Sequence, residues 1–521
     1  MFQMVRLLVA ALLVAAAAAV PALADNVRKP LGLYLQYDVV YALQKAHLET
    51  ASEAQKVAYV KSDLAKLLAS PILSGIAIGG HWDDLQPNQP AAGDTACKSC
   101  DWGYLDDAVE VAKAAGKTVQ FNLTPGFDSP EWEKKKLTAC DTLFNASKTA
   151  DPDCGSVEFA NFPEEFRVKP DPGTKVYTLP LPWSSTYQED WGNFLEAVAE
   201  HFKGDKTLVA IELTGPIGGS NEMILPTTSS KSTTQVGGVD ADDAWSALIA
   251  NYDKDTKHPN YDPKSDQILI DAWVASIKQS EQIFSGLTLS LSPDTGNALP
   301  TFGSKSATTH PDDAALDGVD CGDVPPEMKL SCEAKVEVES QLFASAAPGQ
   351  AAIQVGGLRG STIPEPGNLG WSGAKLTTAS YTDLWTKPKA MAGAEFDFPV
   401  ARPKSDEGCT GKDSCTLTPE QAEANVLGVF FHHTSAGQYY GDSAADNWHE
   451  TASYLEVLLD DVEYFEKKQC EAPAGQVSVF KQLADANQHI LEMAGQTVAA
   501  KDVCAVSPKP VPSAKRIGKK K

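Results

Sequence analysis

The chain has few basic residues for its acidic content, and beyond residue 24 it lacks any long apolar run. Lysine and arginine number 44 against 69 aspartates and glutamates, so the formal net charge is −25. A chain this acidic should repel nucleic acid and anionic membranes. No segment after residue 24 is apolar enough to cross a bilayer, which takes about 20 residues. These absences are compatible with a neutral substrate, such as a glycan, but they exclude partners rather than identify one.

Several motifs of catalysis and cofactor binding are also missing. There is no Gly-x-Ser-x-Gly elbow, which counts against an α/β-hydrolase. No glycine-rich phosphate fingerprint follows an early strand, so a dinucleotide site is not indicated. No His-x-x-x-His or glutamate-paired histidine spacing marks a metal centre. We therefore predict no metal and no cofactor.

The first 24 residues have the pattern of a secretory signal peptide. Arg6 precedes the apolar run 7–20, and Ala22-Leu23-Ala24 is a small-x-small cleavage signal. We expect cleavage before Asp25 and a secreted or periplasmic protein; an uncleaved anchor is the alternative, but the run is short for one. A basic tail, 507–521, should be disordered.

Ten cysteines agree with export, because closely spaced pairs in an exported chain suggest disulfides. A redox or zinc site at Cys97-Lys-Ser-Cys100 is the alternative, although no second ligand pair has zinc spacing. Proximity in sequence gives five pairs: Cys97 with Cys100, Cys140 with Cys154, Cys321 with Cys332, Cys409 with Cys415, and Cys470 with Cys504.

Short apolar runs alternate with helical stretches along most of the chain, which is typical of a parallel sheet covered by helices. The predicted strands are 31–37, 75–80, 118–123, 208–213, 287–292, 351–356, 391–396 and 427–432. The predicted helices are 54–69, 104–115, 188–202, 266–284, 327–343, 381–390, 419–425 and 444–465. Glycines 116, 204, 286 and 349 fall between a helix and the next strand, where a left-handed residue ends a helix. We predict an α/β fold, a (β/α)8 TIM barrel, with a doubly wound sheet as the alternative.

The barrel is predicted to be one domain, 25–466, with long loops on its active-site face. Glycine- and proline-rich segments follow several strands, and four of the five proposed disulfides fall in or next to loops on that side. A C-terminal helical extension, 467–506, contains a helix at 477–498 and is closed by Cys470 and Cys504.

Two glutamates are the candidate catalytic residues. Glu222 follows the fourth predicted strand and Glu395 ends the seventh. Hydrolysis of a glycosidic bond takes one carboxylic acid to protonate the leaving oxygen and a second carboxylate to attack, about 5 Å away in a retaining enzyme. We assign Glu222 as acid/base and Glu395 as nucleophile, with Glu212 and Asp397 as their respective alternatives.

Aromatic, amide and imidazole side chains near strand ends could bind sugar. Tryptophan faces stack on sugar rings, and amides and histidines can hydrogen-bond hydroxyl groups; packing within loops is the alternative for each. The predicted substrate-binding set is His81, Trp82, Asn122, Trp132, Asn221, Asn297, Trp371 and His432. Trp102, Trp191 and Trp273 are assigned to the core.

Four segments resemble clan A glycoside hydrolases, which include the family 5 cellulases and mannanases and the family 42 β-galactosidases. They are the Trp82 loop ending Leu85-Gln86-Pro87, the stretch from Asp101 to Val119, Asn221-Glu222, and Glu395 at the end of a strand. The pattern of Gly215-Pro216 before Glu222 more faintly resembles β-amylases, which are inverting. The resemblance implies a retaining barrel enzyme acting on a β-linked glycan, with an oligo- or polysaccharide as partner. A non-catalytic carbohydrate-binding barrel is the alternative.

Overall fold

The fold described by the computed structural model is α/β. The described residues are 27–140 except 92 and 95, then 154–159, 176–213, 267–291, 350–355, 394–397, 452–459 and 478–493, with a few single positions between them. The predicted signal peptide, the basic tail and most long loops lie outside these residues, so the predicted domain boundaries stay predictions.

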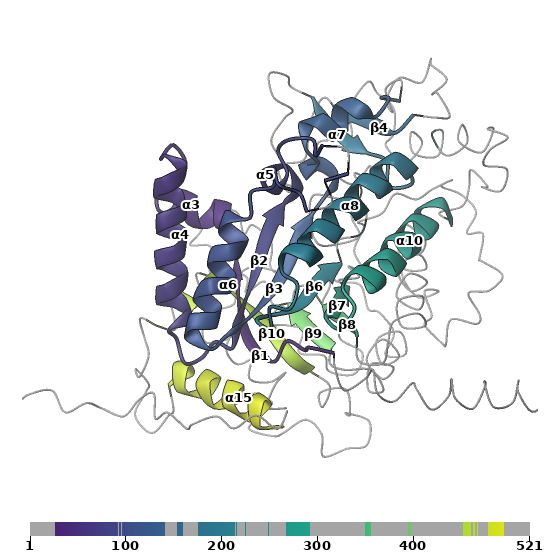
Figure 1. The fold of residues 1–521 in the computed structure, drawn as a ribbon. Helices are drawn as coiled ribbons and strands as arrows, with labels where there is room; N and C mark the ends of the chain where they lie inside the picture. The colour runs from purple at the N-terminus through teal and green to yellow at the C-terminus, as the bar shows by residue number, and fades with distance from the viewer. Residues whose placement is uncertain are drawn as a thin grey trace, which may run out of the picture.

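Eight parallel strands curl into a closed barrel in the order β1-β10-β9-β8-β7-β6-β3-β2 (Figure 1). Their bounds are β1 Gly32–Tyr37, β2 Gly75–His81, β3 Thr118–Thr124, β6 Leu208–Leu213, β7 Thr288–Leu291, β8 Ala351–Val355, β9 Ala394–Asp397 and β10 Ala452–Leu458. The first seven strands in chain order fall where the sequence predicts them. A separate antiparallel pair, β4 Ser156–Phe159 and β5 Tyr177–Pro180, stands apart from the barrel.

Amphipathic helices cover the outside of the barrel. Helix α6 contacts β2, β3 and α4, and α8 contacts α10. The long helices are α4 Glu53–Leu68, α6 Gly103–Ala115, α8 Ser185–His201, α10 Gln267–Ile283 and α15 Val479–Met493; the short ones are α3 Val39–Lys45, α5 Trp82–Leu85, α7 Glu131–Lys136 and the 3-10 turn η1 Gly126–Asp128.

Local sequence explains where these helices begin and end. Ser52 and Gln55 form a capping box at the start of α4, which satisfies backbone donors that have no partner inside the helix. Three of the predicted helix-to-strand glycines, 116, 204 and 286, have φ of 67°, 78° and 89°. Glycine adopts this left-handed conformation without the clash that a Cβ causes, so these predictions are confirmed.

Polar side chains inside the lower part of the barrel bond to one another. We call Tyr34, Thr118, Gln120, Tyr454 and Glu456 the barrel floor. The Gln120 amide donates to Glu456 Oε1 over 2.8 Å, the Tyr454 hydroxyl donates to the same oxygen, and the Tyr34 hydroxyl bonds the Thr118 hydroxyl. The rings of Tyr34 and Tyr454 meet edge to face with centroids 4.5 Å apart. Strands β1, β3 and β10, distant in sequence, are therefore joined inside the barrel.

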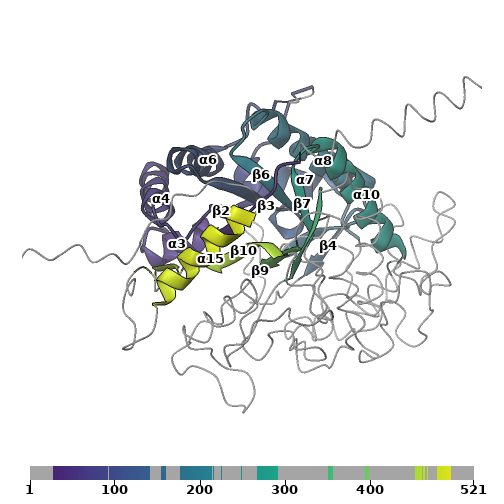
Figure 2. The same ribbon diagram turned by 90° about the horizontal axis from the view of Figure 1, so that it is seen from below.

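Helix α15 lies across the end of the barrel where β1 and β2 begin (Figures 1 and 2). Asn487 Oδ1 accepts from the Leu33 backbone N–H over 2.9 Å and from the Ser74 hydroxyl over 2.6 Å. This helix was predicted at 477–498, and the structure confirms it over 479–493.

The barrel closes with a strand that the sequence prediction assigned to a helix. Residues 452–458 form β10, whereas 444–465 was predicted helical and 427–432 was predicted to be the eighth strand. The helical assignment is wrong for β10. Tyr454 and Glu456, whose polar groups suggest a surface position, are buried and face the barrel interior. The 427–432 segment, with His432, lies outside the described residues.

Candidate functional site

Strands β2 and β3 bring several polar residues together at their carboxyl ends. His81 ends β2 in register with Thr124, which ends β3, and Asn122 pairs with Gly79. Asp83 follows His81 in the first turn of α5, and η1 returns the chain so that Asp128 faces His81. We call His81, Asp83, Asn122, Thr124 and Asp128 the barrel rim. In barrels of this kind, such strand ends form the face on which ligands bind.

A tight turn after β3 sets the position of Asp128. Gly126 has φ of 70°, which favours glycine, and its N–H donates to the Tyr187 hydroxyl over 2.8 Å. Because Tyr187 belongs to α8 and is fully buried, the turn is fixed against the helical layer. The rim is thus held by packing that lies behind it.

One imidazole and two carboxylates converge at the rim. His81 Nδ1 lies 3.6 Å from Asp128 Oδ1, and one ligand atom each from His81, Asp83 and Asp128 fall within 4.8 Å of one another. The His81 side chain is 44% exposed and that of Asp128 is 12% exposed, so the cluster opens on one side. This is the one group within the described part of the chain whose composition and spacing suit a metal ion.

Burial and charge shift the pKa values of these groups. Burial tends to lower the pKa of His81, but the carboxylates of Asp128, Asp84, Asp83 and Asp38 outweigh it, so the pKa is raised. Burial, followed by repulsion from Asp84 and Asp128, raises the pKa of Asp83 to about 6. Groups that titrate near neutral pH are suited to proton transfer.

The Asp128 carboxyl is also affected. Burial raises its pKa, against the opposing attraction of His81 and the hydrogen bond from the Thr124 hydroxyl. Burial is the largest of these effects, so the pKa of Asp128 lies above its ordinary range.

Two buried polar atoms at the rim have no hydrogen-bond partner among the described residues. They are Asp83 Oδ1 and Asn122 Oδ1. Buried polar atoms in proteins are nearly always bonded, and unbonded ones mark strain, catalysis or a missing ligand. Their concentration beside β2 and β3 identifies this part of the molecule as the candidate site.

Glu133 lies behind the rim, on α7, and is fully buried. Burial first, and then the adjacent Asp190 carboxylate, raise its pKa to about 9, although Lys136 opposes them. Lys136 forms an ion pair with Asp190. Glu133 therefore carries a proton at neutral pH.

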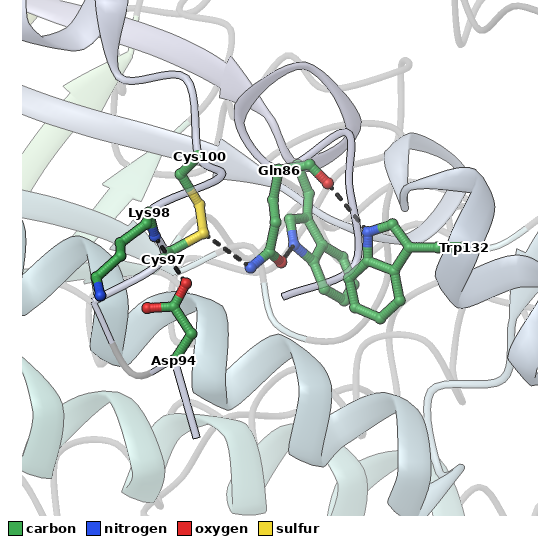
Figure 3. The surroundings of a disulfide bond; sticks show 7 residues. Gln86, Asp94, Cys97, Lys98, Cys100 and Trp132 are labelled. Carbon is green, nitrogen blue, oxygen red and sulfur yellow. Dashed lines mark hydrogen bonds between the residues drawn. A yellow bond between two sulfur atoms is a disulfide. The ribbon is translucent and has the colours of Figure 1, made fainter. Parts of the chain in front are cut away.

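Two tryptophans predicted as sugar platforms pack against each other. Trp82 is fully buried; its Nε1 donates to Gln86 Oε1 over 2.8 Å, and Trp132 meets it edge-on with centroids 5.9 Å apart. Trp132 Nε1 donates to the Gln86 carbonyl over 3.1 Å (Figure 3). Trp191 and Phe194 of α8 cover the Trp82 ring. This corrects the predicted role of Trp82, because its ring is fully buried, whereas Trp132 is only partly buried and its predicted role stays a prediction.

The three tryptophans assigned to the core are there: Trp102, Trp191 and Trp273 are buried.

The catalytic glutamates are only partly covered by the described residues. Glu395 lies in β9, the seventh barrel strand in chain order, in register with Tyr454 of β10 and Gln354 of β8. For Glu395 and its alternative Asp397 the backbone alone is described. Glu212, the alternative acid/base, is buried inside β6 in register with Asn122 and Ser290. Glu222, Asn221, Asn297 and Trp371 lie outside the described residues, and their roles stay predictions.

Sequence reasoning found His81 and Asn122 but missed Asp83, Thr124 and Asp128. Asp83 follows β2 and Asp128 follows β3. Because parallel strands of a barrel end at the same face, these two positions could have been predicted to lie close together.

Two of the five predicted disulfides fall within the described residues, and both are present. Cys97 is bonded to Cys100 and Cys140 to Cys154, with Cα atoms 5.3 Å and 4.9 Å apart. Figure 3 shows Gln86 Nε2 donating to Cys97 Sγ over 3.1 Å, so the first bridge contacts the residue that also binds Trp82 and Trp132.

The other three predicted disulfides are not tested by the structure. Their cysteines lie outside the described residues: Cys321 with Cys332, Cys409 with Cys415, and Cys470 with Cys504. These three bridges therefore stay predictions.

No protein-family model matches the chain, and no curated protein matches it in sequence. Solved structures do resemble it. The catalytic domain of β-amylase from Paenibacillus polymyxa is 11% identical, with 88% of this chain and 99% of that one covered and a TM-score of 0.40. A β-galactosidase from the psychrophilic Marinomonas ef1 is 11% identical over 90% of this chain and 61% of that one, with a TM-score of 0.34.

The β-glycosidase BGL167 is also 11% identical, over 92% of this chain and 98% of that one, with a TM-score of 0.38. With identities of 11% and low TM-scores, the resemblance concerns the fold alone. It gives no information on the chemistry of the site. Among the described residues, no helix is long and apolar enough to span a membrane.

Proposed function

We propose that the chain is an exported retaining glycoside hydrolase that cleaves a β-linked glycan by double displacement on a (β/α)8 barrel. The observation that carries the proposal is the place of two strands in the barrel. Strand β6 is fourth and β9 is seventh in chain order among the eight parallel strands. Glu222 follows β6 and Glu395 lies in β9, so the sequence supplies a carboxylate at each of these two positions.

Barrel topology supports a meeting of these two groups. The carboxyl ends of all eight strands surround one mouth, and catalytic groups on barrels come from the ends of several strands. Strands β6 and β9 are separated in the barrel by β7 and β8. A retaining mechanism requires their two carboxyl groups to approach to about 5 Å.

The barrel rim supports a polar ligand at the same mouth. His81 is partly exposed and Asn122 Oδ1 has no hydrogen-bond partner, so both could bind sugar hydroxyl groups. The substrate proposed is accordingly an oligo- or polysaccharide. Export through the predicted signal peptide is part of the proposal, and the two disulfides support it because disulfides persist in oxidising compartments.

Hydrolysis of a panel of aryl β-glycosides and of plant and bacterial polysaccharides tests the proposal. We expect Glu395→Gln to lower kcat by several orders of magnitude and Glu222→Ala to slow substrates with poor leaving groups most, since it removes protonation. Glu131→Gln, a substitution on the surface of α7, is the control for expression and handling. If Asp397→Asn abolishes turnover and Glu395→Gln does not, the nucleophile is Asp397.

Azide rescue separates the two roles. In Glu395→Ala, azide can replace the missing carboxylate and attack the anomeric carbon directly, giving a glycosyl azide of inverted configuration. In Glu222→Ala, azide replaces water in attacking the glycosyl-enzyme, so the azide product retains configuration. Full activity of Glu222→Ala on natural glycan would contradict the assignment. No hydrolysis across the panel, together with measurable glycan binding, would replace the enzyme with a non-catalytic carbohydrate-binding barrel.

A further inference from the structure

We propose that His81, Asp83 and Asp128 form a binding site for one divalent transition-metal ion at the barrel rim. The site would join the segment after β2 to the turn after β3. It does not depend on the proposed hydrolase function, because the three residues are placed by the fold itself.

The spacing of the three groups is the first support. The 3.6 Å between His81 Nδ1 and Asp128 Oδ1 is too long for a hydrogen bond. Ligand atoms about 2.0–2.2 Å from one ion lie about 3–4.4 Å from each other, depending on the bond angle. The 3.6 Å separation falls inside that range. The three ligand atoms lie within 4.8 Å of one another, so the side chains need to move inward only slightly to coordinate one ion.

An unpartnered atom is the second support. Asp83 Oδ1 is buried with no hydrogen-bond partner among the described residues. The Thr124 side chain is 9% exposed, and its hydroxyl forms a hydrogen bond to the Asp128 carboxyl, which holds that carboxyl in place. Leaving the Asp83 oxygen unbonded costs free energy. A bound ion would satisfy it.

The charges around the cluster also favour a cation. The carboxylates of Asp38, Asp83, Asp84 and Asp128 all act on His81. Lys134 opposes them, since its charge acts on both Asp83 and Asp128. The group of carboxylates carries more negative charge than this lysine offsets, and a divalent ion would neutralise the remainder.

The ligand chemistry indicates which ion. Imidazole suits Zn²⁺ and similar transition metals, whereas Ca²⁺ prefers sites made of oxygen ligands alone. One histidine and two carboxylates therefore favour Zn²⁺ or Mn²⁺ over Ca²⁺. Three protein ligands leave coordination positions for water or for hydroxyl groups of a ligand at the barrel mouth.

Metal titration of the full chain tests the site. The protein, stripped with a chelator, is titrated calorimetrically with Zn²⁺, Mn²⁺ and Ca²⁺, and with Co²⁺ to record its visible absorption. We expect one Zn²⁺ or Mn²⁺ per chain, weaker Ca²⁺ binding, and a Co²⁺ band typical of nitrogen and oxygen ligands. His81→Gln and Asp128→Asn should each weaken binding at least tenfold.

Asp84→Asn is the matched control, because Asp84 adjoins the ligands in sequence and is exposed. It should weaken binding less than tenfold. Circular dichroism establishes that each variant folds, and the partly exposed His81→Gln decides the outcome if Asp128→Asn does not fold. Absence of binding to the wild-type chain, or equal affinity in His81→Gln, would overturn the site. Neither result tests the hydrolase proposal. If the chain hydrolyses no glycan, the metal-site proposal is unaffected.

Discussion

The barrel floor and the barrel rim share strand β3, but they differ in how many of their buried polar atoms have hydrogen-bond partners. On the floor, Glu456 accepts two hydrogen bonds and Tyr34 bonds Thr118. Among floor side chains only Gln120 Oε1 lacks a partner. At the rim, Asp83 and Asn122 each have a buried oxygen without one.

This difference separates stability from ligand binding along a single strand. Strand β3 carries Thr118 and Gln120 on the floor and Asn122 and Thr124 at the rim. Bonded polar groups fix the barrel's register, and unbonded ones are available to a ligand at a cost in stability. Variants at matched positions can therefore measure the difference directly.

The largest effect is expected from two glycines of β2. A Cβ on Gly75 would lie 2.4 Å from the Tyr34 ring and 2.5 Å from the Thr118 carbonyl, whereas a Cβ on Gly79 would meet only the Asn122 carbonyl at 3.8 Å. Gly75→Ala should lower the free energy of unfolding by about 3 kcal/mol, because the backbone carbonyl cannot move aside easily. Gly79→Ala should change it by less than about 1 kcal/mol. Denaturant unfolding measures both, and equal losses would contradict a floor packed more tightly than the rim.

A smaller effect is expected from Glu133 and depends on pH. Its pKa is raised from an ordinary 4.5 to about 9, so between these values the unfolded chain ionises while the folded chain keeps the proton. The folded state binds more protons, and the free energy of unfolding should fall as pH rises through this window. Glu133→Gln cannot ionise and should flatten the profile, by on the order of 1 kcal/mol between pH 5 and pH 8.

Urea unfolding of wild type and Glu133→Gln at pH 5 and pH 8 measures this change. Glu131→Gln, on the same helix, is the control and should keep the wild-type slope. Parallel profiles for wild type and Glu133→Gln would show that Glu133 does not hold its proton in the folded state.

The smallest effect is expected from one threonine on the floor side of β3. The Thr118 hydroxyl bonds the Tyr34 hydroxyl. Thr118→Val should destabilise the chain by about 1 kcal/mol, because it leaves the Tyr34 hydroxyl without this partner. Thr118→Ser, which keeps the hydroxyl group, is the control and should lose less. Denaturant unfolding measures both, and an equal or larger loss for Thr118→Ser would mean that the hydrogen bond does not stabilise the floor.

Sequence periodicity was sufficient for seven of the eight barrel strands. It failed at β10, because Glu456 is buried in the barrel and accepts a hydrogen bond from Gln120, a residue more than 300 positions away. No local pattern records such partners.

The candidate site was harder to predict for the same reason. Asp83 and Asp128 meet only through the pairing of β2 with β3 and the turn at Gly126. The role of Trp82 was misjudged because the rings that cover it come from α8, about 100 residues later. Polar residues at the end of a single strand could be predicted, whereas tertiary contacts decide which of them lie together.

The closing strand of the barrel also sets the order in which the chain can complete its fold. Strand β1 pairs with β10, and Leu33 donates to Asn487. Strand β2 pairs with the other edge of β1 and is made early, but during synthesis nearly the whole polypeptide must emerge from the ribosome before β10 is available. A chain truncated before residue 452 would present open strand edges at β1 and β9, which invite aggregation. Late closure would also suit a polypeptide that crosses a membrane unfolded and completes its tertiary structure on the far side.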